Sequence, residues 1–470
     1  MRFLAPMVTG TALALAAAAG CGARSDTLAD VGAAGTTGTG GAGASGGNGG
    51  NGGSGNNGGD GNNGGDGNNG GGGGGNTPEC TPLEAVVVTA PPYMNSLLPR
   101  LAHSGGPDEK ARAVLGLVEI PAEGPVGIMS QAHTLGLEPW GAWPPPFAQT
   151  AMLSNVEGQI AIAEGINDDL AALYMTPAGD VLYSPGLAAG APGPGAGLDI
   201  TTKAAPCFLA KQQTGHVFGL GTAYTLPSGE GATEITVGFA ALTLAGPMLA
   251  WMVPLGCSQG GAAADGEAVK GGALVAFGSG TTPLELAGCA GGLEPGFPFS
   301  NRLVIAKITG NPTTAMLGAV DDGYSQVDGI AMAGRSDGAW VVWSRFAFQG
   351  DPGTVQAARL DDDGNFAAGP WKLAEGFNLH TGAIGADRLG DDLVVAWADV
   401  SQIPTRIEVR RLDGTGAAVA KGSFEVKDSL MQAISVLGSP TGSDVLLAYS
   451  LWSEAEQSSK VHLQRLGCAQ

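Results

Sequence analysis

The chain has 470 residues and a formal net charge of −21. A chain this acidic has no basic surface that could neutralise the phosphates of nucleic acid or of anionic lipid head groups, so neither is expected as an electrostatic partner. Its 82 glycines far exceed the usual share of about 7%; because they are concentrated in one early stretch, the rest of the chain must be interpreted separately.

The first twenty residues have the pattern of a cleaved targeting peptide. Arg2 precedes an apolar run too short for a comfortable membrane span, and the run ends in "AAGC". Small residues directly before a cysteine resemble the lipobox of bacterial lipoprotein signal peptides, although Leu is more usual where Ala18 stands. The resemblance implies removal of residues 1–20, attachment of acyl chains such as palmitate to Cys21, and an anchor that does not span the bilayer.

The residue after the cysteine bears on the destination of such a lipoprotein. Gly22 is not a charged residue of the kind linked with retention at the inner membrane. The resemblance therefore implies an outer-membrane or cell-surface location, with a periplasm-facing orientation as the alternative. An ordinary secretory peptide that is cut nearby is the other interpretation of the same residues.

A glycine- and asparagine-rich segment follows at residues 21–77. It has no large apolar residue from Gly32 to Thr77, so it cannot bury enough surface to offset its chain entropy. Its hexad "GGDGNN" lacks the large apolar residue of calcium-binding β-roll repeats, so no calcium site is expected there. We expect a disordered tether that carries a folded domain at residues 78–470.

A repeat runs through this folded domain. Its clearest landmark is the Leu that ends "AARL", "VRRL" and "LQRL", at intervals of about 52 to 54 residues. An aromatic residue within an apolar run keeps the same period, at Trp343, Trp397 and Tyr449. Weaker copies extend backwards, so that the recurring apolar residues are Ile120, Met175, Leu242, Ile308, Leu360, Leu412 and Leu466. Seven copies are predicted.

The clearest unit, residues 327–374, contains four short apolar runs separated by "RSDG", "FQGDPGT" and "DDDGNF". Asp-Gly supplies the positive φ of tight hairpins, so each unit is predicted to be a small antiparallel meander. Such a sheet cannot bury both faces alone. Four strands per unit, repeated about seven times, resemble a β-propeller. Six or eight blades, or a sandwich with a smaller β domain, are the alternatives for this all-β chain.

The ends of the domain predict how a ring would close. The last element, "KVHLQRLGC", lacks an outer strand, whereas "EAVVVTA" at residues 84–90 is an early strand without a partner. Their pairing would bring Cys80 and Cys468 together as a disulfide clasp. Cys257 and Cys289 lie in one unit and are the second suggested pair. Cys207 is then left as a buried free thiol or, alternatively, as a reactive nucleophile.

No residue is predicted to be catalytic. The five histidines are scattered, and the chain has no nucleophile elbow, phosphate loop, zinc motif or dinucleotide-binding motif, so no metal or cofactor is expected. The acidic turn at residues 361–363 lacks the spacing of a calcium loop and is interpreted as a solvated hairpin turn. In "EPWGAWPPPF", Trp140, Trp143 and Phe147 form a weak candidate binding surface, with packing over a propeller opening as the alternative.

These observations favour a tethered propeller that binds a partner protein or a glycan. A secreted propeller hydrolase or lyase that acts on envelope or extracellular polymers is the first alternative, because propeller enzymes assemble their catalytic groups from distant blades. A structural scaffold in an envelope assembly is the second alternative.

Overall fold

The structure is a computed structural model. It describes residues 78–468 apart from short gaps, and these gaps are residues 89–92, 105–111, 122–129, 138–139, 141–142, 144, 146, 167–168, 187–195, 201–203, 259–262, 282–287, 294–300, 310–315, 322–325, 347–351, 377–382, 400–403, 427–428, 441, 443 and 454–457. The expected signal peptide, Cys21 and the expected tether lie outside the described residues.

The described strands form antiparallel meanders, which we number as blades. Blades 1 and 2 contain β2 (Tyr93–Ser104), β3 (Arg112–Pro121), β4 (Ser130–Leu137), β5 (Phe147–Glu164), β6 (Leu170–Met175), β7 (Val181–Ser184) and β8 (Ala196–Gly197). Blade 3 contains β9 (Ala204–Gln212), β10 (Gly215–Thr225), β11 (Gly231–Thr243) and β12 (Gly246–Ser258), and blade 4 contains β13 (Ala264–Val269), β14 (Gly272–Ser279), β15 (Arg302–Ile308) and β16 (Met316–Asp321).

The later blades follow the same plan. Blade 5 contains β17 (Val327–Arg335), β18 (Gly338–Arg345), β19 (Gly353–Leu360) and β20 (Phe366–Gly376), and blade 6 contains β21 (Ile384–Leu389), β22 (Asp392–Asp399), β23 (Thr405–Leu412) and β24 (Ala418–Val426). Blade 7 contains β25 (Ser429–Gly438), β26 (Asp444–Ser453), β27 (Ser458–Cys468) and β1 (Cys80–Val88). A short 3₁₀ helix, η3 (Gly288–Gly291), lies between β14 and β15.

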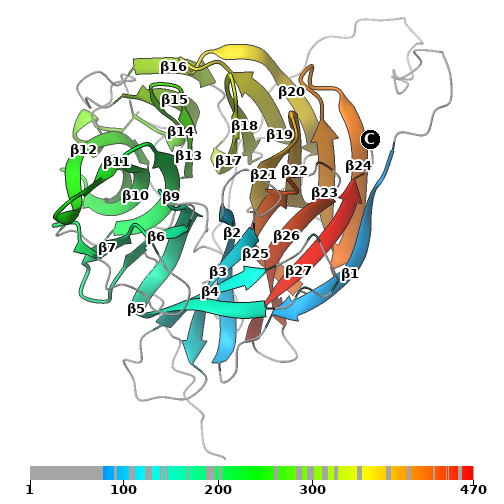
Figure 1. Cartoon of the computed structure of the whole chain (residues 1–470). Coiled ribbons are helices and arrows are strands. Elements are labelled where there is room, and N and C mark those ends of the chain that lie inside the picture. Colours follow the sequence, from blue (N-terminus) through cyan, green and yellow to red (C-terminus); the bar gives the residue numbers. More distant parts are fainter. Residues whose placement is uncertain are drawn as a thin grey trace, which may run out of the picture. The chain divides into compact units, whose positions relative to one another are not determined.

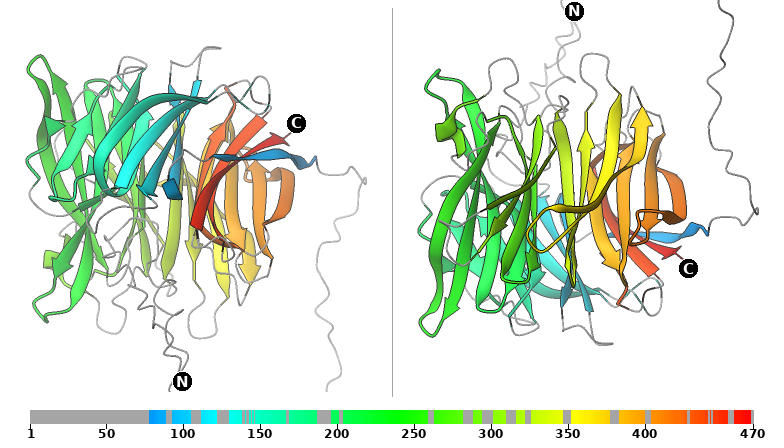
Figure 2. Two further views of the ribbon diagram at one scale, coloured as in Figure 1. Left: turned by 90° about the horizontal axis from the view of Figure 1, so that it is seen from below. Right: turned by 90° about the horizontal axis from the view of Figure 1, so that it is seen from above.

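The blades surround a common axis (Figure 1). The innermost strand of each blade contacts the innermost strands of both neighbours, in the ring order β2, β5, β9, β13, β17, β21, β25 and back to β2. Figure 2 shows the same blades side on, with their strands packed face against face around the ring. The fold is therefore a seven-bladed β-propeller, as the repeat predicted.

Blades 1 and 2 share one long strand. Residues 147–156 of β5 pair with β4 as the outer strand of blade 1, whereas residues 157–164 pair with β6 as the inner strand of blade 2. In these two blades the predicted landmarks do not lie on the same strand as in the later blades. Ile120 and Met175 lie on β3 and β6, the second strands of their blades, whereas Leu242, Leu360 and the other later landmarks lie on third strands. The blade number is unaffected.

The ring closes through its two ends. β1 pairs antiparallel with β27, with Cys80 opposite Cys468, so the N-terminal strand completes the last blade, as predicted. A disulfide joins these two cysteines. The N-terminal strand therefore closes the ring by backbone hydrogen bonds and by a covalent bond.

The core is divided among the interfaces between blades. Each of the seven interfaces contains its own cluster of buried apolar side chains. On β18, Trp343 packs into the interface with blade 4 and Trp340 into that with blade 6, so this middle strand is buried on both faces. Trp343, Trp397 and Tyr449 are all buried, which confirms their expected place in the core.

A basic residue of the repeat connects successive blades. It precedes the recurring apolar residue on the third strand. The Lys307 Nζ atom lies 2.7 Å from Asp363 Oδ1 in the next blade. Arg359 likewise donates to the Gly414 carbonyl at 3.3 Å, and Arg411, almost fully buried, donates to the Cys468 carbonyl at 3.0 Å. The repeated "RL" of the sequence therefore contributes a polar contact between blades.

The aspartate that follows the recurring Leu builds a tight turn. Asp361 Oδ1 accepts the backbone N–H groups of Asp363 and Asn365, both at 2.9 Å, and Gly364 has a φ of 83°. Asp413 accepts the N–H of Thr415 at 2.8 Å in the same way. These acidic residues stabilise hairpin turns through their side chains.

A buried histidine connects blades 2 and 3. His216 Nδ1 lies 2.6 Å from the Tyr183 hydroxyl, and its Nε2 lies 2.9 Å from the Glu164 carbonyl. Since a carbonyl only accepts, Nε2 carries the proton and the tyrosine donates to Nδ1. Burial lowers the pKa of His216 to about 4; the Glu164 carbonyl opposes this shift, and the charge of Lys211 adds to it.

None of the helices in the described parts of the chain combines the length and the apolar character needed to cross a membrane.

Replacing both Cys80 and Cys468 with Ser should lower the free energy of unfolding by about 2–5 kcal/mol. The reason is that this disulfide joins residues separated by 388 positions. Urea titration of the purified protein measures the change. The double replacement of Cys257 and Cys289, which are separated by only 32 positions, is the matched control and should cost less. Equal stability of the Cys80/Cys468 variant and the wild type would contradict a role in ring closure.

His216 should make the protein acid-labile. The unfolded chain protonates this residue below about pH 6.5, whereas the folded state resists protonation until about pH 4. The stability that neutral His216 contributes is therefore fully present above pH 6.5. The free energy of unfolding should fall by about 3 kcal/mol on acidification to pH 4. In His216→Gln this loss should disappear from unfolding free energies measured at pH 7, 5.5 and 4.5. Parallel pH profiles for variant and wild type would show that another group is responsible.

Candidate functional site

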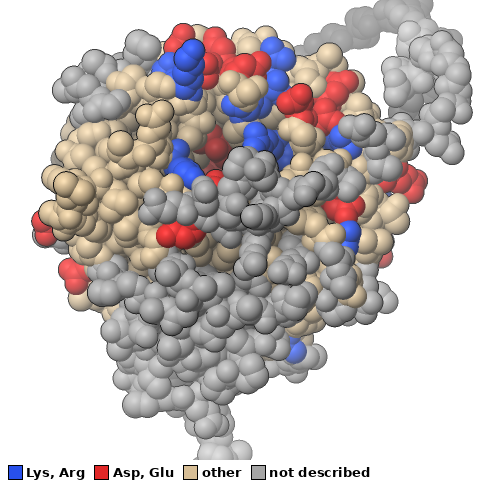
Figure 3. All heavy atoms as spheres, in the orientation of Figure 1, with Lys and Arg blue, Asp and Glu red and all other residues tan. Residues whose placement is uncertain are grey.

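The innermost strands enclose a cavity on the propeller axis. Its volume is about 570 Å³, and it is lined by β2, β5, β9, β13, β17, β21 and β25, one strand from each blade. Figure 3 shows the hollow near the middle of one face, with acidic side chains visible inside it and basic side chains near its edge. Its size lies within the range of about 300–1,000 Å³ that small-molecule sites occupy.

Charged residues of both signs line this cavity. The innermost strands are otherwise rich in Ala, Gly and aliphatic residues, which allow the blades to approach closely at the axis. The basic lining residues are Arg100, Lys211, Arg335 and Arg388, and the acidic ones are Glu164, Asp265, Glu267 and Asp387. Four of the 22 Lys and Arg residues of this acidic chain therefore lie in one cavity.

Asp265 is held firmly by the backbone. Its Oδ2 accepts the N–H of Met332 on β17 at 2.8 Å, and its Oδ1 accepts the N–H of Gly266 at 2.9 Å. Burial raises the pKa of Asp265 to about 6, although both N–H groups and the charge of Arg100 oppose that shift. At neutral pH this carboxylate is therefore ionised and fixed in place between blades 4 and 5.

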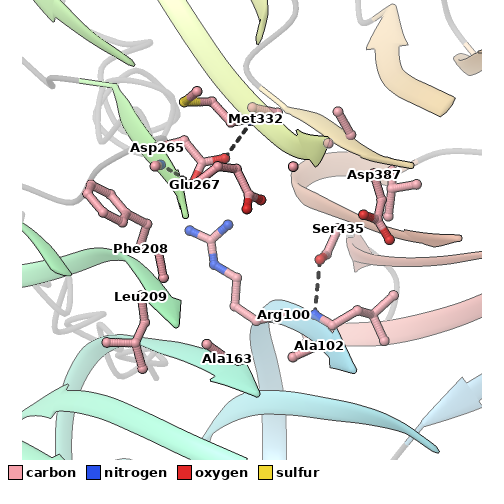
Figure 4. A pocket seen from close by; sticks show the side chains of 18 of the residues that line it. Arg100, Ala102, Ala163, Phe208, Leu209, Asp265, Glu267, Met332, Asp387 and Ser435 are labelled. Carbon is pink, nitrogen blue, oxygen red and sulfur yellow. Dashed lines mark hydrogen bonds between the residues drawn. The ribbon is translucent and has the colours of Figure 1, made fainter. Parts of the chain in front are cut away.

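Glu267 lies two residues further along β13, so its side chain emerges on the same side of the strand as that of Asp265. Burial raises the pKa of Glu267 well above its ordinary value, and the charges of Asp265 and Asp387 add to this effect. Figure 4 shows Arg100 extending from β2 across the cavity towards both carboxyl groups. Burial lowers the pKa of Arg100, against the attraction of Asp265.

Four further charged groups of the cavity have partners in the protein. Lys211 Nζ lies 3.3 Å from Glu164 Oε1. Asp387 accepts the N–H of Gly438 at 2.8 Å, and its Oδ2 lies 3.7 Å from His103 Nε2. Arg335 Nε donates to Asp337 Oδ1 at 2.9 Å, and the guanidinium lies over the ring of Trp340. Arg100, Asp265 and Glu267 form a group of buried charged residues contributed by β2 and β13.

This group can orient a polar molecule or exchange protons with it. A guanidinium beside an ionised carboxylate and a carboxyl group of raised pKa offers hydrogen-bond donors and acceptors in a poorly solvated space. Across the described ranges, no cluster of three or more His, Cys, Asp or Glu side chains has the geometry to hold a metal ion.

The aromatic segment lies away from this group. Trp140 and Trp143 are half-buried against the cluster between blades 1 and 7, and the Nε1 atom of each is buried without a hydrogen-bond partner. The side chain of Phe147 lies outside the described residues. Neither tryptophan lines the axial cavity.

The structure describes every cysteine of the chain except Cys21. Cys257 and Cys289 are joined by a disulfide, and η3 is fixed further by the Cys289 N–H, which donates to Glu234 at 2.8 Å. Cys207 is buried on β9, and no cysteine in the described part of the chain is a free thiol. The expectation of a free Cys207 is therefore wrong in this structure. The proposed lipidation at Cys21 falls on an undescribed residue.

Sequence reasoning did not find the charged group of the axis. Arg100, Asp265 and Glu267 belong to no local motif, because β2 and β13 are brought together only when the ring closes. One signal was present: two acidic residues alternate within the short first strand of blade 4, where the other repeats offer mostly small or apolar residues.

Comparisons with known proteins add little beyond architecture. No protein-family model matches the chain, and no curated protein matches it in sequence. Solved structures do resemble it. A protein of unknown function from Dyadobacter fermentans aligns at 12% identity and a TM-score of 0.43, covering 83% of this chain and 100% of that one.

Two further structures with similar folds come from unrelated settings. The haemagglutinin-neuraminidase ectodomain of parainfluenza virus 5 aligns at 9% identity and a TM-score of 0.40, covering 84% of this chain and 87% of that one. The WD40 domain of SCAP from fission yeast aligns at 8% identity and a TM-score of 0.39, covering 82% and 98% respectively. At such scores these similarities carry no inference about activity, so the chain is assigned a propeller fold and no family.

Proposed function

We propose that this chain is a lipid-anchored envelope protein whose propeller captures a polar ligand, presented by a glycan or a partner protein, in its axial cavity. The observation that carries the proposal is the cavity itself: seven strands from seven blades converge on it, and it contains the buried carboxyl groups of Asp265 and Glu267. Burying a charged group costs free energy unless it is paired, so such groups commonly mark functional sites.

The anchor is supported by the sequence alone. "AAGC" resembles a lipobox, and the glycine-rich segment after it would let the propeller stand clear of the membrane. The outer membrane or cell surface is the proposed location, because Gly22 is not an inner-membrane retention residue. Envelope compartments also permit the disulfides Cys80–Cys468 and Cys257–Cys289.

The hydrolase or lyase alternative has one specific observation in its favour. Asp265 and Glu267 are two carboxyl groups in one cavity whose pKa values are both raised, Asp265 to about 6. Such a pair can supply an acid and a base at near-neutral pH. Binding without turnover remains the proposed function, because Asp265 accepts two backbone N–H groups and holds two blades together.

Replacing Cys21 with Ala should abolish acylation of the chain. The variant should keep its signal peptide and lack the acyl mass, whereas the wild type should lose residues 1–20 and be acylated. Mass spectrometry of the N-terminal peptide measures both properties. The thioether to lipid uses the same sulfur as a disulfide would, so a peptide joining Cys21 to Cys207 in the unreduced protein would contradict the lipoprotein assignment.

Filling the cavity should abolish ligand binding. Ala163, on β5, lines the cavity and is half-buried, so Ala163→Trp should occlude it. Ala250→Trp, at an exposed position on β12, is the matched control. Glycans and envelope extracts captured by the wild type and the control, but not by Ala163→Trp, would support the cavity. Equal capture by all three proteins would indicate that the loops, and not the cavity, bind the ligand. Chemical conversion of a captured ligand would favour the enzymatic alternative.

A further inference from the structure

The hairpin of β11 and β12 in blade 3 presents apolar side chains to solvent. Among the described residues, six large apolar side chains are exposed, and three of them, Leu244, Met248 and Met252, lie on this hairpin. The sequence from residue 235 to residue 264 contains no Asp, Glu, Lys, Arg or His. Figure 3 shows uncharged surface on the side where Figure 1 places β10, β11 and β12. Exposed apolar patches of this kind mark interaction surfaces.

The turn that carries Leu244 has a defined conformation. Thr243 pairs with Gly246 across the hairpin, so the loop consists of Leu244 and Ala245 alone. The Thr243 hydroxyl donates to the Gly246 carbonyl at 2.7 Å and accepts the Ala245 N–H at 3.2 Å. Gly246 has a φ of 114°, which side-chain-bearing residues rarely adopt. The exposed Leu244 is therefore presented without the entropic cost of ordering a flexible loop on binding.

The backbone of β12 is poorly suited to pairing with a further β-strand. Pro247 and Pro254 lack the N–H groups that a ladder of hydrogen bonds needs. Two register shifts also interrupt the pairing of β12 with β11, after Ile235 and after Phe239, and such bulges turn an edge away from a neighbouring strand. The apolar side chains are therefore the part of this hairpin that can make a contact.

The hairpin turn lies at the end of the propeller where the N-terminal chain enters it. Four antiparallel strands return the chain to the end where it started, so every blade has the same orientation. The turn at Leu244 joins the third and fourth strands of blade 3. In blade 7 the third strand, β27, ends at Cys468, opposite the start of the fourth strand, β1, at Cys80. Residues 1–77 therefore join the propeller at the end that carries the exposed turn.

The proposed anchor would bring this end of the propeller to a bilayer. A glycine-rich coil of the length between Cys21 and Cys80 spans roughly 40 Å, so the propeller can stand clear of the lipid or touch it. A flexible tether also keeps the hairpin at a high effective concentration near the bilayer, so a weak contact suffices. The net charge of −21 disfavours anionic head groups, whereas the uncharged hairpin can approach a neutral lipid surface.

We propose that the β11–β12 hairpin docks the propeller onto a neutral lipid bilayer, with Leu244, Met248 and Met252 as the side chains that enter the lipid. They would lie at the boundary between head groups and acyl chains, as the apolar face of an interfacial helix does. The choice of a bilayer as the partner rests on the proposed anchor, whereas the apolar surface does not. A second contact fixes the orientation of the axial cavity relative to the membrane, which a flexible tether alone does not.

Vesicle co-sedimentation tests the hairpin separately from the anchor. Arg24 is followed by no Lys or Arg before Arg100, so limited tryptic digestion of the folded, purified protein should release residues 25–470 from an acylated N-terminus. We expect the released chain to bind phosphatidylcholine vesicles at millimolar lipid. Added salt should not weaken this binding, because no ion pair contributes to it. Vesicles that also contain phosphatidylglycerol should bind the chain no more tightly.

Variants identify the side chains that make the contact. Leu244→Asp and Met248→Asp should each weaken vesicle binding by at least about tenfold, because each removes the burial of one large apolar side chain. Leu244→Phe keeps an apolar side chain at the turn and should retain binding. Val87→Asp is the matched control, because Val87 lies on β1 of blade 7 and its exposure of 44% is close to the 50% of Met248. Unfolding curves establish that each variant is folded.

Three results would overturn the lipid assignment: no binding of the released wild-type chain to neutral vesicles, undiminished binding of Leu244→Asp, or binding to anionic vesicles alone. A dimer in sedimentation equilibrium that Leu244→Asp dissociates would also overturn it, and would assign the hairpin to a second copy of the chain. If the N-terminal peptide carries no acyl mass but the released chain still binds neutral vesicles, the proposed anchor fails and the hairpin contact survives.

Discussion

The whole architecture depends on the fact that a four-stranded sheet with two apolar faces needs a neighbour on each side. On β18, Trp340 and Trp343 point to opposite faces, and neither face could be exposed to water without a large loss of stability. An open row of such sheets would leave two apolar faces exposed at its ends. Closing the row into a ring removes both ends, because blade 7 packs against blade 1. The pairing of β1 with β27 joins the N-terminal strand to the last blade of this ring.

Ring closure also creates the candidate site. The innermost strands meet around an axis where no further backbone fits, and the remaining space is filled or left open by side chains. Small residues keep the cavity open, while Arg100, Asp265 and Glu267 supply its chemistry from opposite sides of the ring. Two of the acidic side chains that line the cavity also have a structural role, since Asp265 and Asp387 each accept an N–H from the next blade. Residues of the candidate site therefore also hold neighbouring blades together.

The sequence predicted the architecture where the repeat is regular and failed where one strand has two roles. In blade 5, Asp-Gly occurs in the turns after the first and third strands, and the predicted unit, residues 327–374, coincides with the observed blade. In blades 1 and 2, the 18-residue strand β5 passes from one blade to the next without a turn, and β3 and β6 are as apolar as the third strands of later blades. A parsing based on turns and apolar runs therefore shifted two landmarks by one strand.

The candidate site could not be predicted in the same way, because its residues come from strands far apart in the sequence. The position of Glu267 carries an acidic residue again in blade 6, as Asp387, but this recurrence does not indicate that Glu267 lies in one cavity with Arg100. Their proximity depends on ring curvature and on the relative registers of β2 and β13, neither of which leaves a local pattern. Cys80 and Cys468 were the exception, because the two unpaired strands at the ends of the domain brought them together by strand register alone.

The location of the clasp has a mechanical consequence. The described residues begin at Pro78, and Cys80 is the first residue of β1, the outermost strand of its blade. A pulling force from the N-terminal side would load β1 at the end where it meets Cys468, and a strand held only by hydrogen bonds would peel away pair by pair. The disulfide lies at this point, so tension passes through a covalent bond into β27, which has a strand on each side of it. The propeller can thus be held by its N-terminus against drag without being unwound from its last blade.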